Sequence, residues 1–409
     1  MESSTSKPVS TFRTLSASLL IAGTCIGGGM LALPISGGPV GFIPSLLVML
    51  VCCIFMTFTG LMYLEATLWM KEKAHLNTLS AELLSPFWRV VCWVTYLFIC
   101  YASLIAYMSG GGKEIIFVVN QLFDQSYENM LGICAFSLVF SMILFLGHRL
   151  VERTNTIMFF SMIFAYVMLI ATSTGSINGP FLLRQEWNIH WFLLFPLMLT
   201  TFSFPGIVPT IVPYLDRNPR AVRQAIIFGT SIAFVVYFMW MFIVLGSVPH
   251  VGEHSLQEAF QCDIPATECL HYALNNPFLS AIAQFFAFFA LSTSFLGISL
   301  SLFDFLRDTI TVPMNAAVKK ILFCIIVFAP SLLLAIYFER AFITALEMSG
   351  GIGDTVISGI IPVIMIWNGR YYLKKKGLYT VWGGKWLLVS IVVVSALIFF
   401  CEILRRILT

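Results

Sequence analysis

The sequence predicts an all-α integral membrane protein with eleven transmembrane helices, and three observations support this prediction. Hydrophobic residues make up 59% of the 409 positions, and the mean hydropathy is +0.91. Charged residues make up only 11%, whereas a soluble protein carries about 25%. Apolar runs long enough to cross a bilayer recur along the whole chain. The composition therefore argues against a soluble enzyme, a nucleic-acid-binding protein and a disordered chain.

The apolar runs follow one another with short polar loops between them. In order, they cover residues 12–36, 40–68, 89–112, 129–147, 154–174, 190–213, 222–247, 278–303, 319–338, 341–367 and 386–404. Each offers roughly the 20 apolar residues that a helix needs to cross the hydrocarbon core. The longest loop, 248–277, is too short for a second domain. The start of the chain lacks the small-residue cleavage site of a signal peptide, so residues 1–11 are expected to form a cytoplasmic tail.

The distribution of positive charge predicts the orientation. With the N-terminus inside, eighteen of the 23 Lys and Arg residues fall on the cytoplasmic side, as the positive-inside rule requires. They are Lys7, Arg13, Lys71, Lys73, Arg89, Arg149, Arg153, Arg217, Arg220, Arg223, Arg307, Lys319, Lys320, Arg370, Lys374, Lys375, Lys376 and Lys385. The five expected outside are Lys113, Arg184, Arg340, Arg405 and Arg406.

Two spans contain residues that interrupt a helix. The first span includes GTCIGGGM at residues 23–30, and each of its four glycines costs a helix about 1 kcal/mol relative to alanine. The sixth has Pro205 and Gly206 near its centre, and proline removes a backbone hydrogen bond and clashes with the preceding turn. The alternatives are a small-residue packing face in the first span and a simple kink in the sixth.

The interrupted spans each begin a group of five, which is typical of an inverted repeat in secondary transporters. The expected divisions are the tail 1–11, a first repeat 12–174, a second repeat 175–367, and a cytoplasmic loop with span eleven over 368–409. A broken helix exposes N–H groups that suit a carboxylate and carbonyls that suit an ammonium. Since Lys and Arg occur in the predicted spans only at their ends and never near a centre, such breaks match a zwitterionic amino acid.

Four stretches resemble the hydroxy/aromatic amino acid permeases of the amino acid–polyamine–organocation superfamily. They are GTCIGGGMLALP in the first span, YASLIAYMSGGGKE in the third, TTFSFPGIVPTIVPYL in the sixth and LSTSFLGISLSLFDFL in the eighth. The likeness covers nearly the whole chain and is greatest to tyrosine- and tryptophan-type carriers. Pro205 departs from the small or polar residue expected there, and it is expected to alter how the sixth span unwinds.

The resemblance implies a leucine-transporter-like fold in a bacterial-type inner membrane, with the N-terminus cytoplasmic and the C-terminus outside. It implies a carrier, not an enzyme, that imports tyrosine, tryptophan or both by alternating access. The expected partners are the amino acid substrate and the lipid bilayer, with no nucleic acid and no metal or other cofactor beyond the coupling ion. The backbone groups expected to hold the substrate belong to Gly23, Thr24, Cys25, Ile26, Gly27, Gly28 and Gly29 in span one and to Thr201, Phe202, Ser203 and Phe204 in span six.

Two tyrosines of the third span receive different predictions. Tyr101 lies near the predicted centre of the span, so its hydroxyl is expected to donate to the substrate carboxylate or to line the side-chain pocket. The alternative is an aromatic ring packed among helices, with its hydroxyl bonded to a neighbour. Tyr107 lies nearer the outer interface and is assigned to the aromatic belt.

The coupling ion is predicted to be a proton, with Na⁺ as the alternative. Asp354 is the acidic residue closest to a span centre, and an intramembrane carboxylate is a functional hypothesis by default. Its alternative role is a structural hydrogen bond to backbone freed by the glycines beside it, while Glu347 and Glu65 are weaker candidates. For sodium, the predicted ligands are Thr293 and Ser294 with carbonyls of span one, although span hydroxyls more often bond to their own helix.

Two other functions are compatible with this scaffold. A sodium-coupled carrier of small neutral amino acids differs only in substrate and ion. A transporter-like substrate sensor or channel belongs to another class, but a sensor usually adds a soluble domain, and a channel does not need broken helices in mirrored halves. An oxidising compartment would allow Cys262 and Cys269 of the 248–277 loop to form a disulfide, and the sequence leaves this pairing open.

Overall fold

The computed structural model describes residues 10–70, 75–124, 126–173, 177–187, 189–274, 276–309, 315–338 and 340–408. Lys7 and most of the predicted tail, together with Lys71 and Lys73, lie outside these ranges. Within them every regular element is a helix, and the β-type pairing recorded there is an isolated bridge between Gly41 and Gln185. The predicted all-α class is therefore confirmed.

The described helices reproduce the eleven predicted spans. Ten are long and apolar enough to cross a membrane, and the bent pair α1 and α2 makes the eleventh by length and composition. The first five spans are α1 (Thr11–Cys25) with α2 (Gly29–Gly37), α3 (Phe42–Leu68), α5 (Pro86–Phe123), α6 (Asn129–Leu146) and α7 (His148–Ser173). The next four are α9 (Phe195–Thr201) with α10 (Val208–Tyr214), α11 (Pro219–Ser247), α14 (Pro277–Thr309) and α15 (Ala316–Tyr337).

The last two spans differ in regularity. Span ten starts as α16 (Ala341–Met348), widens into the π-helical segment Ser349–Ile360 and continues as α17 (Ile361–Trp367), whereas span eleven is the unbroken α18 (Gly384–Leu408). Short elements connect the spans: α4 (Leu76–Leu83), α8 (Gly179–Leu183), a 3₁₀ turn at Ile189–Leu194, α12 (Leu256–Cys262) and α13 (Ala266–Leu274).

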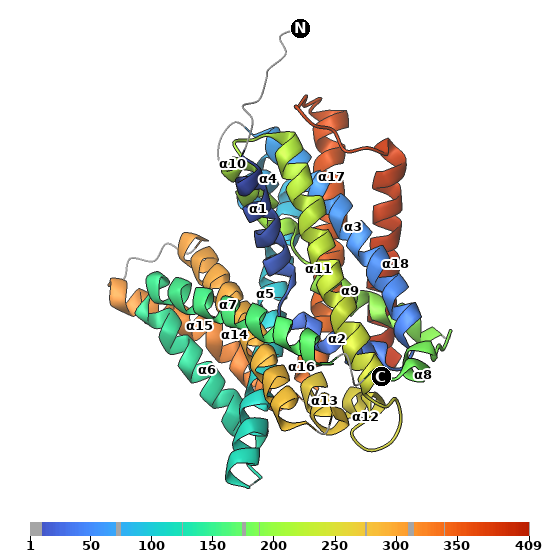
Figure 1. Ribbon diagram of the computed structural model, residues 1–409. Helices are drawn as coiled ribbons and strands as arrows, with labels where there is room; N and C mark the ends of the chain where they lie inside the picture. The colour runs from blue at the N-terminus through green and yellow to red at the C-terminus, as the bar shows by residue number, and fades with distance from the viewer. Residues whose placement is uncertain are drawn as a thin grey trace.

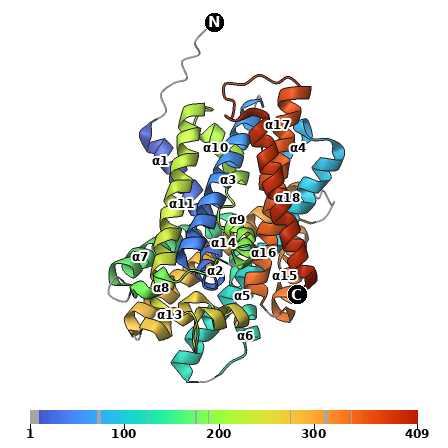
Figure 2. The same ribbon diagram turned by 90° about the vertical axis from the view of Figure 1, so that its right-hand side faces the viewer.

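The helices form an upright group and a tilted group. In Figure 1, α1, α3, α11, α17 and α18 stand roughly parallel, while α6, α7, α14 and α15 lean away from them. Helix α5 joins the groups, because it packs against α6, α14 and α15 and also against α16. Figure 2 shows α3 and α11 side by side, with α18 along the outside.

Span three extends eleven residues beyond its predicted end. Three glycines at 110–112 remain inside the helix instead of ending it, because they allow neighbouring helices to come close. A Cβ at Gly112 would lie 2.5 Å from the backbone nitrogen of Ile133 on α6. Here glycine serves helix packing at the expense of some intrinsic helix stability.

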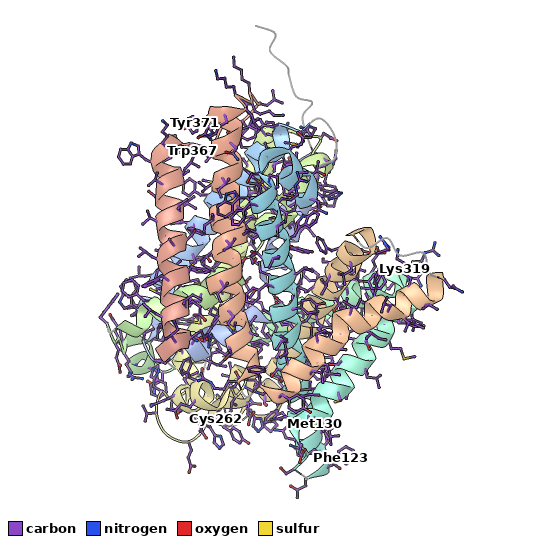
Figure 3. All side chains as sticks on the ribbon, turned by 180° about the vertical axis from the view of Figure 1, so that it is seen from behind. Phe123, Met130, Cys262, Lys319, Trp367 and Tyr371 are labelled. Atoms are coloured by element: carbon purple, nitrogen blue, oxygen red, sulfur yellow. The ribbon has the colours of Figure 1, made fainter. Side chains whose placement is uncertain are left out.

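The pairing of Cys262 with Cys269, which the sequence left open, is not present in the structure. All ten cysteines lie in the described part of the chain, and all are free thiols. Cys262 is exposed at the end of α12, and Figure 3 shows it at the end of the molecule opposite Trp367 and Tyr371. Cys269 is buried in α13, where its thiol lies 3.9 Å from the carbonyl of Ser255. The two cysteines sit in different environments on separate short helices, which the sequence separation alone did not reveal.

Candidate functional site

The first span is broken where the sequence predicts. Helix α1 ends at Cys25, α2 begins at Gly29, and the two helices are bent by 57°. A Cβ at Gly28 would lie 2.6 Å from Cε1 of Tyr107 and 2.7 Å from Cδ2 of Leu291. A Cβ at Gly27 would collide with the hydroxyl of Ser294. These glycines therefore let the broken backbone touch α5 and α14.

The sixth span is interrupted just before Pro205. Helix α9 ends at Thr201, residues 202–204 lie outside a helix, and a 3₁₀ turn runs from Pro205 to Ile207. Proline suits the first position of a helical turn, because a backbone N–H at that position would have no acceptor within the helix. Pro205 therefore starts the next helical piece, and the unwound residues precede it.

Tyr237 on α11 connects the two breaks. Its hydroxyl oxygen lies 2.6 Å from the carbonyl oxygen of Cys25 and 2.7 Å from that of Thr201, the last residues of α1 and α9. Helix-end carbonyls have no partner within their own helix, so the phenol supplies a hydrogen-bond donor in place of the backbone N–H groups that the breaks remove. The ring of Phe202 packs edge-on against Tyr237, with centroids 5.1 Å apart. Sequence analysis missed Tyr237, and the only signal for it was a tyrosine inside a span, whose hydroxyl needs a partner.

The two predicted sodium ligands have different surroundings. The backbone N–H of Gly28 donates to the hydroxyl of Ser294 at 3.3 Å, so Ser294 touches the break in span one. The hydroxyl of Thr293 lies 2.9 Å from the carbonyl of Phe289 and 3.2 Å from that of Ala290, both in its own helix. Only Ser294 of this pair makes a described hydrogen bond to span one.

Neither tyrosine of span three lies in the first environment predicted for it. Tyr101 donates its hydroxyl to the carbonyl of Ile326 on α15 at 2.9 Å, which is the packed-aromatic alternative. Tyr107 is only 7% exposed and lies against Gly28, and its hydroxyl interacts with Ser294. The assignment of Tyr107 to the aromatic belt is therefore wrong. Tyr107, not Tyr101, is the span-three phenol beside the break.

Asp354 contacts the break in span six through the hydroxyl of Ser203. It lies in the π-helical segment with no exposed surface, and its Oδ1 accepts hydrogen bonds from Ser203 at 2.5 Å and Ser358 at 3.3 Å. Its Oδ2 has no hydrogen-bond partner among the described residues. The described partners are side-chain hydroxyls, not the freed backbone of the structural alternative. π-Helical turns often occur at functional sites.

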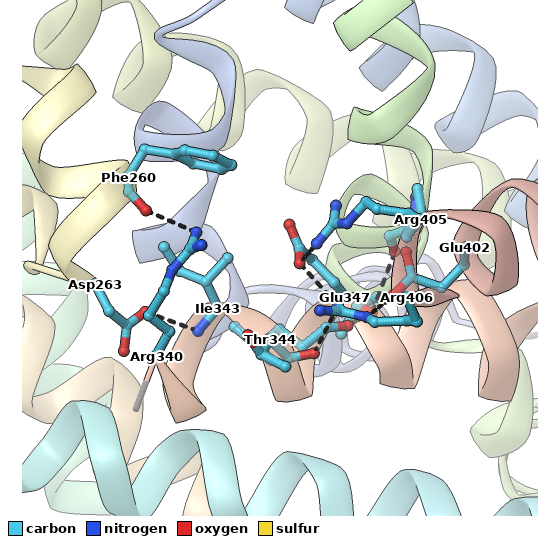
Figure 4. A network of polar contacts seen from close by, with 12 residues as sticks. Phe260, Asp263, Arg340, Ile343, Thr344, Glu347, Glu402, Arg405 and Arg406 are labelled. Atoms are coloured by element: carbon cyan, nitrogen blue, oxygen red, sulfur yellow. Dashed lines mark hydrogen bonds and ion pairs between the residues drawn. The ribbon is translucent and has the colours of Figure 1, made fainter. Parts of the chain in front are cut away.

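The weaker carboxylate candidates are neutralised by arginines. Glu65 accepts from Arg370 at 2.5 and 2.7 Å. Glu347 is paired with Arg405 and, at 3.0 Å, with Arg406, and Figure 4 shows both arginines converging on it. Both glutamates are therefore held in ion pairs.

Several predicted site residues lie at the edge of this cluster or outside it. A Cβ at Gly23 would meet Phe159 at 3.1 Å, and Thr24 is exposed with its hydroxyl bonded to Leu20. The ring of Phe204 packs where a Cβ at Gly60 of α3 would lie, 2.7 Å from its Cζ. The side chain of Phe204 thus joins the packing with α3.

The remaining predicted residues contribute mainly backbone. The half-buried Ile26 donates its N–H to Ala22 at 2.8 Å, and the hydroxyl of Thr201 donates to Met198 at 2.8 Å. A Cβ at Gly29 would lie 3.2 Å from the methyl group of Thr201, so the two broken spans touch here. Among the described residues, no group of three or more His, Cys, Asp or Glu side chains is placed to hold a metal ion.

Comparison with known proteins gives a consistent result. The sequence model of the tryptophan/tyrosine permease family matches residues 10–402. The chain is 30% identical to a tryptophan-specific transport protein of Haemophilus influenzae, over 94% of each chain. It is 27% identical to tyrosine-specific transport system 1 of the same organism, over 94% of this chain and 95% of that protein.

A solved structure shares the fold at low sequence identity. The crystal structure of MhsT in complex with L-phenylalanine matches with a TM-score of 0.66 and 13% identity, over 97% of this chain and 98% of that chain. The leucine-transporter-like architecture with interrupted first and sixth helices is therefore confirmed.

Proposed function

Because this chain belongs to the tryptophan/tyrosine permease family, we propose that it imports tyrosine, tryptophan or both by proton symport with alternating access. The observation that carries this proposal is the pair of helix breaks joined by Tyr237. Together they place helix-end carbonyls of α1 and α9 near the amino end of α2. This arrangement binds a zwitterion without any basic side chain.

Each end of the substrate has a partner in this arrangement. The carboxylate lies at the start of α2, where Gly29 offers an N–H group beside Gly28, the phenol of Tyr107 and the hydroxyl of Ser294. The ammonium lies at the carbonyl ends of α1 and α9, where it shares the terminal carbonyls with Tyr237. This assignment follows from the dipole of each half-helix.

An aromatic side chain fits the apolar groups beside the breaks. Phe202, Tyr107 and Leu291 all approach the broken backbone, and aromatic rings favour edge-on contacts such as that between Phe202 and Tyr237. The printed names of the relatives, which are tryptophan- and tyrosine-specific, support the same class of substrate.

Asp354 is the proposed proton carrier. It is buried without a cation among its described contacts, and its hydrogen bond to Ser203 links its charge state to the break in span six. A proton on Asp354 neutralises a carboxylate that is costly to keep charged at membrane depth. Because Ser203 joins this carboxylate to the break in span six, we infer that protonation of Asp354 and closure around the substrate favour each other. The hydroxyl of Thr293, bonded within its own helix, gives less support to a sodium site.

The proposed orientation places the N-terminus in the cytoplasm and the C-terminus outside, in a bacterial inner membrane. The eighteen Lys and Arg residues assigned to the cytoplasmic side, against five outside, support it, and each of those five has a polar partner in the structure. Lys113 pairs with Asp263, Arg184 with Glu186, Arg340 with the carbonyl of Phe260, Arg405 with Glu347, and Arg406 with Glu402. Acidic side chains thus offset the charge of four of these five cations, and Arg340 bonds to a neutral carbonyl.

The test is uptake of labelled tyrosine and tryptophan into proteoliposomes under separately imposed proton and sodium gradients. We expect accumulation with an inward proton gradient, and its collapse when a protonophore is added. Strong uptake of serine without either aromatic substrate would refute the aromatic assignment. Accumulation driven by sodium alone would refute proton symport and remove Asp354 as the carrier.

A further inference from the structure

A hollow of about 420 Å³ lies between the first parts of α1 and α11. Both helices start at the same end of the molecule, as Figure 1 shows, and on the proposed orientation that end is cytoplasmic. The two helices touch further along, where a Cβ at Gly229 would lie 2.6 Å from Cβ of Ile21. The hollow therefore lies between this contact and the cytoplasmic ends of the helices. The lining residues that matter here are Thr14, Leu15, Ser18, Arg220, Gln224 and Phe228.

The part of the hollow near the helix starts is positively charged. The hydrogen bond described for Arg220 comes from its backbone N–H, which donates to Asn218 at 3.0 Å, so its guanidinium has no partner among the described residues. Gln224 lies one helical turn further along the same side of α11. None of the lining residues is acidic, and Asp216, just before α11, is already paired with Arg13 at 2.6 Å. The hollow thus offers a guanidinium to an anion and holds no carboxylate that would repel one.

The part of the hollow further along the helices is apolar and faces outward. Leu15 and Phe228 line it and are 52% and 57% exposed, and Leu19 and Ile227 beside them are also exposed. At 1.5 Å per residue, Phe228 lies roughly 13 Å from the first residue of α11. The polar headgroup layer of a bilayer is only about 6 Å deep on each side. Arg220 therefore lies at headgroup depth, and Phe228 reaches the hydrocarbon layer.

One class of ligand matches both parts. A free phosphate would satisfy Arg220 and leave the apolar residues uncovered, whereas a phospholipid with a net negative headgroup covers them with an acyl chain. The hydroxyls of Thr14 and Ser18 donate to backbone carbonyls at 3.5 and 2.9 Å, so their oxygens can still accept hydrogen bonds. Together with the amide of Gln224, they suit a headgroup that carries hydroxyls, such as that of phosphatidylglycerol. Phosphatidylcholine brings its own cation and has no hydroxyl to donate.

We propose that this hollow binds an anionic phospholipid of the cytoplasmic leaflet, with its phosphate on Arg220 and an acyl chain along Leu15 and Phe228. The inference goes beyond the proposed function, since it depends on the proposed orientation and not on the substrate or the coupling ion. Helix α1 ends at the first helix break. A lipid bound between α1 and α11 therefore connects the membrane with the broken span.

The test is photo-crosslinking of the purified full-length protein in phosphatidylcholine vesicles that contain phosphatidylglycerol with a photoreactive headgroup. We expect crosslinks in the peptides that cover residues 11–18 and 218–228. Arg220→Glu changes the local charge by two, so crosslinking should fall roughly 30-fold, which corresponds to about 2 kcal/mol. Gln224→Trp keeps the charge but fills the hollow, and it should also lose the crosslink.

Two further variants separate the site from general surface attraction and from misfolding. Arg223→Glu makes the same charge change at an exposed arginine of α11 that does not line the hollow, so its crosslinking should stay close to the wild-type level. Arg220→Lys keeps the positive charge and should keep most of the crosslink. Equal losses in Arg220→Glu and Arg223→Glu would mean that the lipid is attracted by the surface as a whole, which overturns the site.

Two other results would contradict the inference. Phosphatidylcholine with the same photoreactive group should not crosslink at these peptides, and equal crosslinking of both lipids overturns the preference for an anionic headgroup. Unlabelled phosphatidylglycerol should compete for the site, whereas soluble glycerol 3-phosphate should not. Competition by glycerol 3-phosphate would show that a free phosphate is enough and would overturn the assignment to a lipid. Uptake of aromatic amino acids is measured separately, so either proposal can fail without the other.

Discussion

Two buried carboxylates on span ten, Glu347 and Asp354, differ in the groups that contact them. Both are almost completely buried, at 2% and 0% exposed. Glu347 lies between two arginines of α18, whereas the described partners of Asp354 are the hydroxyls of Ser203 and Ser358. Burial is the same in both places, so the partners decide the role. A paired carboxylate holds helices together, and an unpaired one at membrane depth is free to exchange a proton.

The largest expected effect is the loss of the ion pair at Glu347. Glu347→Ala removes a buried carboxylate from the half-buried Arg405, and removing one partner of a buried pair costs about 3–5 kcal/mol of folding free energy. Thermal unfolding of the purified protein should show a large drop in midpoint temperature. Glu82→Ala is the control, because the exposed pair of Glu82 with Lys375 at 3.7 Å should contribute less than about 1 kcal/mol. Equal stability of both variants would contradict the structural role of Glu347.

The next effect concerns coupling at Asp354. Asp354→Asn keeps the shape and the bond to Ser203 but removes the titrating group, so proton-driven accumulation should fall by roughly 100-fold, within the range of coupling between two sites. Exchange of labelled for unlabelled substrate without a gradient should change much less. Accumulation at the wild-type level in this variant would show that another group carries the proton.

A smaller effect is expected at Tyr237. Tyr237→Phe leaves the terminal carbonyls of Cys25 and Thr201 without their donor, and a buried unpaired acceptor costs about 1–3 kcal/mol. Without the phenol the ends of α1 and α9 are no longer held together, so we expect the KM for uptake to rise by roughly ten-fold, which corresponds to about 1.4 kcal/mol. Unchanged KM and kcat would mean that the breaks do not need the phenol.

The smallest expected effect is a difference in KM between phenylalanine variants of the two tyrosines of span three. Tyr107→Phe should raise the KM by about three-fold, the value of one ordinary hydrogen bond. Tyr101→Phe should leave the KM unchanged and lower only stability, because its hydroxyl bonds to Ile326 on α15. The reverse result would restore Tyr101 as the substrate-facing phenol.

The sequence predicts the spans and the breaks well, because apolar runs and clustered Gly or Pro act locally. It fails where a contact joins distant spans. Nothing in the sequence near Tyr237 indicates that its hydroxyl reaches α1 and α9. The different outcomes for Tyr101 and Tyr107 have a simpler cause. The span predicted over 89–112 is centred near Tyr101, whereas the observed helix runs from Pro86 to Phe123 and is centred closer to Tyr107.

The hydroxyl of Tyr237 has one hydrogen but two carbonyl oxygens within reach. At any instant the hydroxyl can donate one strong hydrogen bond, so one of the two oxygens accepts only a weak one. The two carbonyls are thus one donor short at the point where α1 and α9 end. On the proposed function, the ammonium group of the substrate brings three N–H donors and supplies the missing one. The count of hydrogens alone therefore favours a cationic head group at this point, without any movement of a side chain.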